Sequence, residues 1–394
     1  MSAHADPAQT TTQATAQTTA QTTAPSSGPS SAPRPHVAVI GGGYGGVAVA
    51  QALDDLAEVT LVEARDTFVH NVAALRALVD AEWTDRIFFP YTRLLAHGTV
   101  RHDRAVHVDG ASVTLASGDR LTPDYTVLAT GSGYPFPAKT DAADSATAAA
   151  LIHAAREQLA ASDRVLLLGA GPVGMELAGE IRAAWPARRV TLLDPADDIL
   201  AGFPDAFRRV VRAELDALGI ELVLGSALKE DPHTAPGTHA PFTAVTGDGR
   251  EVAADLWFRC HGVAPATGYL DAALADAVRR PDGHLRVTPE LRLPGHERIF
   301  ALGDITDVPE AKTAKAAGEH AAVVAANIRA LAEGGPGAAL TAHAPGAPAI
   351  ALPLGPERGA SYAPDMGILD AATTSEIKGD DLMIAPYTEI FGLT

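Results

Sequence analysis

Two stretches of the chain show an apolar run that passes directly into glycines and then into a helical pattern. In the first, residues 36–40 (HVAVI) predict a buried parallel strand, and Gly41, Gly43 and Gly46 complete the spacing G-x-G-x-x-G. The following strand, VTLVE, ends at Glu63, 22 positions after Gly41, where a carboxylate can accept hydrogen bonds from ribose hydroxyls. This first unit predicts a dinucleotide-phosphate site at a helix N-terminus.

The same pattern returns in the middle of the chain. The run RVLLLGAGPVGMELAGEI begins at Arg164 and places Gly169, Gly171 and Gly174 between a predicted strand and a predicted helix. The next strand, VTLLD, ends at Asp194, 25 positions after Gly169. Because both copies have a strand before the glycines and an acid after the second strand, they predict two bound dinucleotides.

A third informative stretch, ERIFALGDITD, ends a short apolar strand at Gly303 and Asp304. Asp304 taken alone is interpretable as a helix cap, but its position after two nucleotide units favours a ligand role. The Ala-rich pattern that follows predicts a helix over residues 310–328, with Lys312 in its first turn. Earlier in the chain, the small residues 129–131 (ATG) end a buried strand, where the main chain can pass close to a flat ligand.

Shorter patterns predict the remaining elements. Alternating apolar and polar residues predict hairpin turns at 109–110 and 118–119, and a Gly-Asp-Gly turn is predicted at 247–249. A helix is predicted over 205–218, with an apolar face of Phe207, Val210, Val211, Leu215 and Leu218. A helical stretch at 72–79 follows His70, and its spacing alone favours a satisfied surface or core histidine there.

The last 55 residues are rich in Pro and Gly at first and apolar near the end. The stretch ALPLGPERGASYAPDMG is interpretable as a hairpin over the active site. The stretch LMIAPYTEIFGL is apolar enough to dock on the body of the protein or on a second chain. The acids Asp380, Asp381 and Glu389 favour docking on the body.

Composition excludes several classes of partner. The net charge of −18 opposes binding to nucleic acid and electrostatic docking on anionic lipid, both of which need clustered Lys and Arg. Cys260 is the one cysteine, so neither an intramolecular disulfide nor a cysteine metal cage can form, and no metal site is expected. We expect Cys260 to be a small buried side chain rather than a nucleophile.

The chain has no run of 18 apolar residues, and its start lacks both a basic-then-apolar signal pattern and a glycine at position 2. We therefore expect a cytoplasmic protein without integral membrane association, although peripheral contact stays open. We expect it to be a monomer or a homodimer.

The motifs described above occur in the same order in the two-dinucleotide flavoprotein reductases. Within that group, DTFVHNVAALRA, GAGPVGMELAGEI, AGEHAAVVAANI and IKGDDLMI resemble the ferroptosis suppressor protein branch of the apoptosis-inducing-factor family, which is related to type II NADH dehydrogenases. The resemblance covers residues 36–394. It implies an FAD-dependent enzyme that uses NADH to reduce a quinone or a quinone-like aromatic acceptor.

The resemblance also implies roles for individual residues. It places Gly41, Gly43, Gly46 and Glu63 at the adenosine diphosphate of FAD, Asp304 at the ribitol, Thr130 and Gly131 along the flavin, and Glu176 beside the nicotinamide of NADH. The second unit, with Gly169, Gly171, Gly174 and Asp194, then holds NADH. We expect Lys312, Glu176 and His70 to be the catalytic candidates, with Lys312 and the adjacent helix N-terminus stabilising negative charge on the flavin.

Two departures from the family pattern fall near the expected approach of the acceptor. Family members carry neighbouring histidines where this chain has Val69 and His70, and an aromatic residue where it has Lys315. These two departures leave the identity of the acceptor open. A third departure is the N-terminal lipid signal that family members can carry and this sequence lacks, so we expect a soluble quinone or a quinone-like aromatic metabolite as readily as ubiquinone or menaquinone. Three alternatives stay open: a tailoring reductase of an aromatic or quinone metabolite, a reductase of a small electron-carrier protein, and a slow NADH-sensing flavoprotein.

The predicted fold is α/β, with two Rossmann-like dinucleotide-binding domains, the NAD domain being inserted into the FAD domain. The expected divisions are a disordered tail (1–34), the first half of the FAD domain (35–145), the NAD(H) domain (146–265), the second half of the FAD domain (266–335) and a small C-terminal segment (336–394). The tail prediction rests on a low-complexity composition of Ala, Thr, Gln, Ser and Pro.

Overall fold

The computed structural model describes residues 34–393. A five-stranded parallel sheet in the order β18-β9-β1-β2-β5 contains the first glycine unit. Its strands are β1 (His36–Ile40), β2 (Glu58–Glu63), β5 (Thr99–His102), β9 (Tyr125–Leu128) and β18 (Ile299–Ala301). The predicted tail lies almost entirely outside the described residues. β18, more than 170 residues after β9, closes one edge of this sheet beside it.

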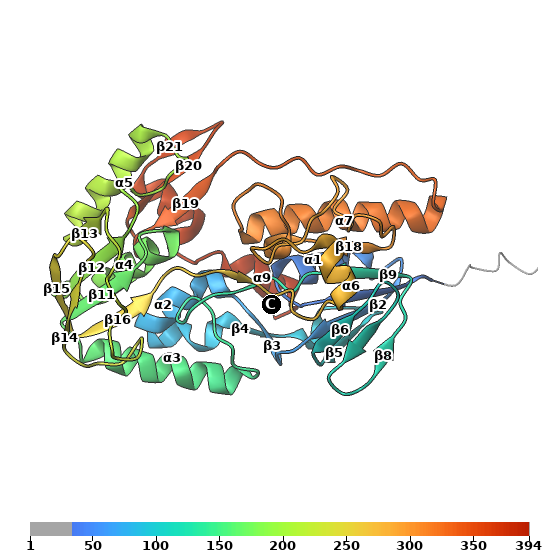
Figure 1. Cartoon of the computed structure of the whole chain (residues 1–394), viewed down its shortest axis with the longest axis horizontal. Helices are drawn as coiled ribbons and strands as arrows, with labels where there is room; N and C mark the ends of the chain where they lie inside the picture. Colours follow the sequence, from blue (N-terminus) through green and yellow to red (C-terminus); the bar gives the residue numbers. More distant parts are fainter. Residues whose placement is uncertain (1–33, 394) are drawn as a thin grey trace, which may run out of the picture. The chain divides into compact units, whose positions relative to one another are not determined.

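A second parallel sheet, in the order β13-β12-β11-β16, contains the second glycine unit (Figure 1). Its strands are β11 (Arg164–Leu168), β12 (Arg189–Asp194), β13 (Ile220–Leu224) and β16 (Leu256–Arg259). The α/β fold with Rossmann-like sheets is confirmed. The domain boundaries stay predictions.

Helices pack against both sheets and bury their apolar sides. Those that follow the glycine turns are α1 (Tyr44–Leu53) and α4 (Pro172–Ala184), and the others before residue 335 are α2 (Ala74–Val79), α3 (Ser145–Ala160), α5 (Asp205–Ala217), α6 (Ala272–Val278) and α7 (Ala314–Gly334). α1 and α7 lie side by side (Figure 1). A Cβ on Gly45 of α1 would lie 3.1 Å from the carbonyl oxygen of Ala317 of α7, so this glycine permits close helix contact.

The predicted helix over 205–218 is confirmed as α5, but its apolar face is narrower than expected. Phe207, Val211 and Leu215 are fully buried, whereas Val210 is 36% exposed. Positions 207, 211 and 215 are spaced by four, so they form one stripe on the side that packs inward. None of the helices in residues 34–393 is long and apolar enough to cross a bilayer.

Short antiparallel pairs connect the main elements. The predicted turns at 109–110 and 118–119 join β6 (Ala105–Val108), β7 (Val113–Leu115) and β8 (Arg120–Leu121). The turn at 247–249 joins β14 (Phe242–Val245) to β15 (Glu251–Ala254). Two further pairs are β3 (Thr67–Val69) with β4 (Phe88–Pro90), and β10 (Ser132–Gly133) with β17 (Ala264–Pro265).

The C-terminal segment forms the expected hairpin, but the hairpin lies on the second unit and not over the active site. Its strands β19 (Ile350–Pro353), β20 (Gly359–Ala363) and β21 (Gly367–Leu369) form an antiparallel sheet, which packs against α4 and α5 (Figure 1). Tyr362 contacts Phe203 and Phe207 there, with ring centroids 6.0 and 5.7 Å away, so apolar burial places this sheet on the second unit.

The chain then returns to the first unit. It passes through α8 (Ala371–Thr374), a π-helical turn (Ser375–Gly379) and α9 (Ile384–Ile390). Leu382, Ile384 and Phe391 belong to the apolar core that also contains β1, β2 and α1. The expected docking of this stretch on the body of the protein is therefore confirmed.

Candidate active site

The first glycine turn has the geometry that its spacing predicts. Gly41 has φ +103°, and a Cβ on it would lie 2.5 Å from the carbonyl oxygen of Ala129. A Cβ on Gly46 would lie 1.8 Å from the carbonyl oxygen of Gly41, so the helix packs directly on the turn. A Cβ on Gly43 would meet nothing within 4 Å. Gly43 is the open side of the turn, where a ligand can approach the main chain.

Glu63 ends β2 with its carboxylate fixed beside this turn. Oε2 accepts from the main-chain N–H of Gly42 at 2.6 Å, and Oε1 accepts from that of Arg65 at 2.9 Å. Tyr91 donates its hydroxyl proton to the carbonyl oxygen of Gly42 at 2.7 Å. These bonds fix the carboxylate at the C-terminal end of a parallel strand, which is where open α/β sheets bind ligands.

A cavity beside the turn brings most of the predicted site residues together. Its wall contains the predicted residues Gly41, Gly43, Glu63, Thr130, Gly131, Glu176, Asp304 and Lys312. A second cavity shares Gly41, Glu63 and Thr130 with it and continues along Arg104 and Tyr269. The two together make a long space that runs past the glycine turn, as an extended dinucleotide requires.

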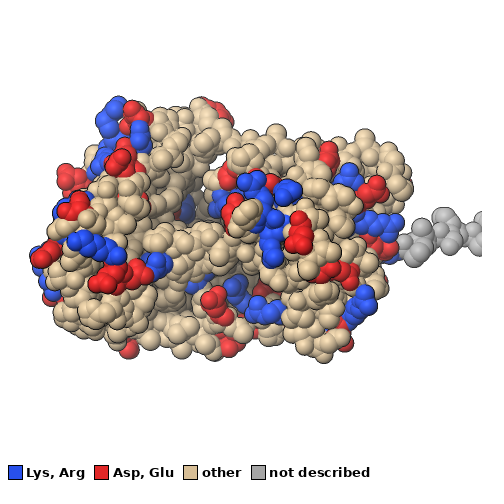
Figure 2. Space-filling view, viewed as in Figure 1, with Lys and Arg blue, Asp and Glu red and all other residues tan. Residues whose placement is uncertain are grey.

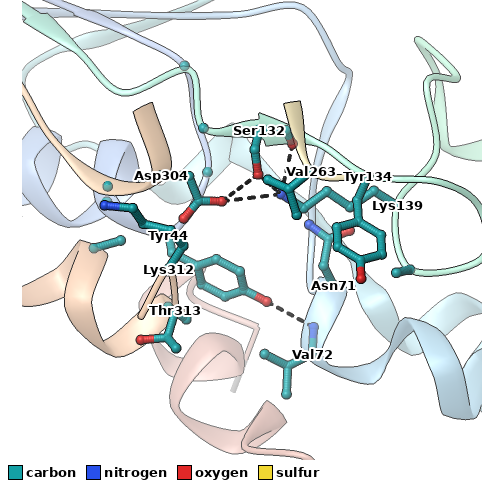
Figure 3. A pocket seen from close by; sticks show the side chains of 18 of the residues that line it. Tyr44, Asn71, Val72, Ser132, Tyr134, Lys139, Val263, Asp304, Lys312 and Thr313 are labelled. Carbon is teal, nitrogen blue, oxygen red and sulfur yellow. Dashed lines mark hydrogen bonds and ion pairs between the residues drawn. The ribbon is translucent and has the colours of Figure 1, made fainter. Parts of the chain in front are cut away.

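Two residues that the sequence did not single out complete the polar end of the cavity. Ser132 donates its hydroxyl proton to Oδ2 of Asp304 at 2.6 Å, and Lys139 Nζ lies 3.0 Å from Ser132 Oγ and 3.6 Å from Oδ2 of Asp304. Figure 3 shows the three side chains pointing toward one another. Burial lowers the pKa of Lys139, which the Asp304 carboxylate opposes. In the sequence, only the position of Ser132 directly after the ATG stretch (129–131) pointed to a role in this site.

The residues present fit FAD. α1 has neither a side chain bonded to its N-terminal N–H groups nor an acid in its first turn, so its N-terminus is free to face a pyrophosphate. Gly43 leaves room for that group, and Asp304 presents a carboxylate to the same cavity. The second cavity offers space for the adenosine end.

The second glycine turn repeats the first. Gly169 has φ +114°, a Cβ on Gly174 would lie 1.9 Å from the Gly169 carbonyl oxygen, and a Cβ on Gly171 would meet nothing within 4 Å. Asp194 ends β12, and its carboxylate accepts from the N–H groups of Ala170 at 2.8 Å and Ala196 at 2.9 Å. The predicted site residues of this unit are therefore gathered at one turn, separate from those of the first unit.

Glu176 links the second unit to the cavity. It lies on α4, the helix that begins at the second glycine turn, and its side chain lines the cavity of the first unit. Oε1 of Glu176 lies 2.6 Å from Nζ of Lys378, which the C-terminal segment supplies. Burial raises the pKa of Glu176, and the ammonium of Lys378 opposes that rise.

His70 was a catalytic candidate, but it does not line the cavity. It is fully buried, and its ring is bonded through Nε2 to the carbonyl oxygen of Leu382 at 2.8 Å and lies 3.3 Å from the Tyr44 hydroxyl. Tyr387 of α9 covers it, with a ring-centroid distance of 4.7 Å. The C-terminal helix therefore makes His70 a satisfied core histidine, which is the interpretation that its spacing alone favoured.

Lys312 lies before the helix and not in its first turn. α7 begins at Ala314, with the side chain of Thr313 as its N-cap. Lys312 Nζ donates to the carbonyl oxygens of Thr306 at 2.9 Å and Val308 at 2.8 Å while lining the cavity. Burial lowers its pKa, which the nearby Asp304 opposes. Lys315 is 77% exposed, is paired with Glu319 on the helix surface and does not line the cavity.

Cys260 is buried at the end of β16, as expected. Burial raises the pKa of its thiol to about 12, so the reactive thiolate is not populated at neutral pH. Its main chain lines the second glycine turn, where a Cβ on Gly169 would lie 2.9 Å from the Cys260 carbonyl oxygen.

Comparison with known proteins identifies the family. The sequence model described as pyridine nucleotide-disulphide oxidoreductase matches residues 35–321, with a further match at 6–86. Apoptosis-inducing factor homolog B of Dictyostelium discoideum is 30% identical, over 90% of this chain and 96% of that protein. Ferroptosis suppressor protein 1 of Homo sapiens is 33% identical, over 81% of this chain and 86% of that protein.

Solved structures share the fold. The sulfide:quinone oxidoreductase of Aquifex aeolicus superposes with a TM-score of 0.61 at 22% identity, over 77% of this chain and 78% of that chain. Putidaredoxin reductase in its covalent complex with putidaredoxin gives a TM-score of 0.64 at 21% identity, over 81% and 79%. The chain therefore belongs to the pyridine nucleotide-disulphide oxidoreductase family, as an FAD-dependent NAD(P)H oxidoreductase related to apoptosis-inducing factor homologues and ferroptosis suppressor protein 1.

Proposed function

We propose that this protein uses NADH, through FAD, to reduce a quinone or a quinone-like aromatic acceptor. The observation that carries the proposal is one cavity whose wall contains Gly43 and Asp304 of the first unit together with Glu176 of α4. Ligands on the two glycine turns can reach each other there. Hydride transfer requires such a meeting, since the reacting atoms must come within about 3–3.5 Å.

Each set of residues has a binding role in this proposal. FAD, when bound, supplies the redox chemistry by taking a hydride and passing electrons on. The proposed contacts are Gly41, Gly43, Gly46 and Glu63 for its adenosine diphosphate, Asp304 for its ribitol and Thr130 with Gly131 for its ring; Gly169, Gly171, Gly174 and Asp194 hold NADH. We add Ser132 and Lys139 as residues that fix the Asp304 carboxylate.

Glu176 is the proposed residue for orienting the nicotinamide. Its side chain is 14% exposed, and its carboxylate lies 2.6 Å from the ammonium of Lys378. A fixed buried carboxylate can accept a hydrogen bond from a carboxamide without moving, which favours one orientation of the ring. Lys312 contributes positive charge to the same wall of the cavity.

The acceptor must take electrons without a thiol relay. The sequence has one cysteine, and burial keeps the Cys260 thiol protonated at neutral pH. The sequence resemblance described above points to a quinone as that acceptor. We propose a small-molecule acceptor because a net charge of −18 repels an acidic electron-carrier protein. On the face drawn in Figure 2, acidic side chains are interspersed with basic ones.

Steady-state NADH oxidation with a panel of acceptors tests the proposal. We expect a soluble naphthoquinone to raise the rate at least tenfold over the rate in air alone, and more than ferredoxin or rubredoxin does. Preference for an electron-carrier protein would favour the reductase alternative. Equally slow oxidation with every acceptor would favour the NADH sensor and contradict the proposal. We keep the cytoplasm as the proposed location and a monomer or homodimer as the proposed state.

A further inference from the structure

A buried cluster of Glu310, His320 and His343 is bonded to the turn that carries Asp304. Oε1 of Glu310 lies 2.6 Å from Nε2 of His320 and 3.1 Å from Nε2 of His343. Oε2 of Glu310 accepts from the main-chain N–H of Gly346 at 3.0 Å. The three side chains are only 5%, 1% and 6% exposed. Nothing in the proposed reaction uses this cluster.

The hydrogen bonds of His320 fix its tautomer. Its Nδ1 accepts from the main-chain N–H of Gly303 at 3.0 Å, so Nδ1 carries a lone pair. In a neutral imidazole the other nitrogen then carries the proton, and Nε2–H donates to Glu310. A metal ion on Nε2 would need the lone pair there and would break the bond to Gly303. The cluster is therefore a hydrogen-bond relay rather than a metal site.

The relay ends at the residue before Asp304. Gly303 has φ +71°, so the turn between β18 and α7 depends on a backbone conformation that few other residues adopt. Its N–H is directed at His320, and the next side chain in the chain, Asp304, points into the cavity toward Ser132 (Figure 3). If Nδ1 of His320 took up a proton, its N–H would face the main-chain N–H of Gly303. Repulsion between these two donors would displace the turn.

We propose that the Glu310–His320 pair positions the Asp304 turn for FAD, so that acid weakens FAD binding. The inference rests on the proposed role of Asp304 at the ribitol. Glu310 and His320 are positioning residues that act through the Gly303 N–H. The Glu310 carboxylate is hydrogen-bonded to Nε2 of the neutral His320 imidazole and keeps the ring in place. His343, from the segment after α7, forms a second hydrogen bond to the same carboxylate.

The direction of the pH effect follows from the groups around His320. Burial lowers its pKa below the ordinary value, as do the nearby His343 and Lys312, while Glu310 raises it. His320 is therefore neutral at pH 7 and takes up a proton only in acid. Protonated His320 disfavours the conformation of the turn that binds FAD. The affinity for FAD is therefore highest above about pH 6.5, the ordinary histidine pKa, and falls as the pH drops through the lowered pKa of His320.

Titration of the apoprotein with FAD from pH 8 to pH 5, followed by flavin fluorescence, tests this inference. We expect the wild-type dissociation constant to rise about tenfold between pH 7 and pH 5. His320→Gln, which cannot take up a proton, should bind FAD about tenfold more weakly at pH 7.5 with a flat pH profile. Glu310→Gln should also weaken binding at pH 7.5. Glu319→Gln removes the same charge from the exposed side of α7 and should match wild type.

Circular dichroism and NADH binding show whether each variant is folded. A flat wild-type profile would overturn the inference without any variant, and so would a wild-type slope that persists in folded His320→Gln. If His320→Gln does not fold, Glu310→Gln decides, since an unchanged affinity and profile in it would also overturn the inference. A protein that binds no FAD at any pH would instead contradict the proposed function.

Discussion

At the residue scale, Asp194 is positioned to discriminate between NADH and NADPH. Its carboxylate is fixed by the N–H groups of Ala170 and Ala196, and residues 195–206 contain no Lys or Arg. Further along the chain, Arg208 and Arg212 on α5 are both paired with Asp198. A 2′-phosphate would therefore meet a negative charge and find no basic side chain on residues 195–206.

We expect wild type to prefer NADH to NADPH by at least tenfold in kcat/KM, and Asp194→Ser to narrow that ratio. Comparison of the two cofactors under the same acceptor measures it. Asp216→Ser, which removes a charge from the exposed end of α5, is the control and should keep the wild-type ratio. Equal use of NADPH by wild type would contradict the role of Asp194.

Lys312 and Lys315 form a natural pair for comparison. Lys312 lines the cavity near Asp304, whereas Lys315 is on the helix surface, paired with Glu319. A lost charge-assisted contact is worth about 1.5–3 kcal/mol, so we expect Lys312→Met to slow acceptor-dependent turnover about tenfold. Lys315→Met should leave it unchanged.

Stopped-flow absorbance separates the NADH and acceptor phases of this comparison. The acceptor phase should slow in Lys312→Met, while NADH affinity changes little. If both phases match wild type, the bonds of Lys312 to the carbonyls of Thr306 and Val308 are its main role. The acceptor site would then lie elsewhere on the cavity wall.

At the element scale, one buried ion pair joins α2, α4 and the C-terminal segment. The guanidinium of Arg76 on α2 makes two bonds to Glu180 on α4, at 2.8 and 2.9 Å, and reaches the carbonyl oxygens of Gly379 and Asp380. Both charged side chains are at most 6% exposed. The pair therefore holds the segment that carries Lys378 close to α4, where Lys378 meets Glu176.

Removal of the cation alone leaves a buried, unpaired carboxylate. We expect Arg76→Met to lower the free energy of unfolding by about 3–5 kcal/mol, measured by urea denaturation. The matched control is Arg329→Met, which breaks the exposed pair with Asp55 between α7 and the end of α1 and should cost less than about 1 kcal/mol. Equal losses in both variants would show that burial of the Arg76 pair has no special effect.

At the scale of the whole molecule, the first glycine turn and Asp304 should stabilise the protein when FAD binds. FAD at about 100 times its dissociation constant adds about 2.7 kcal/mol to the folded state, which corresponds to a rise in Tm of several degrees. FMN lacks the adenosine diphosphate that the glycine turn and Glu63 are expected to hold, so it should raise Tm less at the same concentration. Calorimetry of the apoprotein compares the two, and an equal effect of FMN would contradict this assignment.

The sequence by itself determined both glycine units, because their chemistry is local. Strand, turn glycines, helix and terminal acid lie within one βαβ unit, so spacing alone predicts the positions of Gly41, Gly43, Gly46 and Glu63. The same holds for Gly169, Gly171, Gly174 and Asp194. Helix α5 and the turns at 109–110 and 118–119 also follow from local patterns.

Only the tertiary structure decided which distant residues meet. Lys378 pairs with Glu176, about 200 positions earlier, and Ser132 reaches Asp304 across 172 positions. His70 is excluded from the cavity because α9 covers it, and Lys312 is bonded to carbonyls of its own loop because α7 begins two residues later. These outcomes depend on packing of elements far apart in the chain, which no local periodicity encodes.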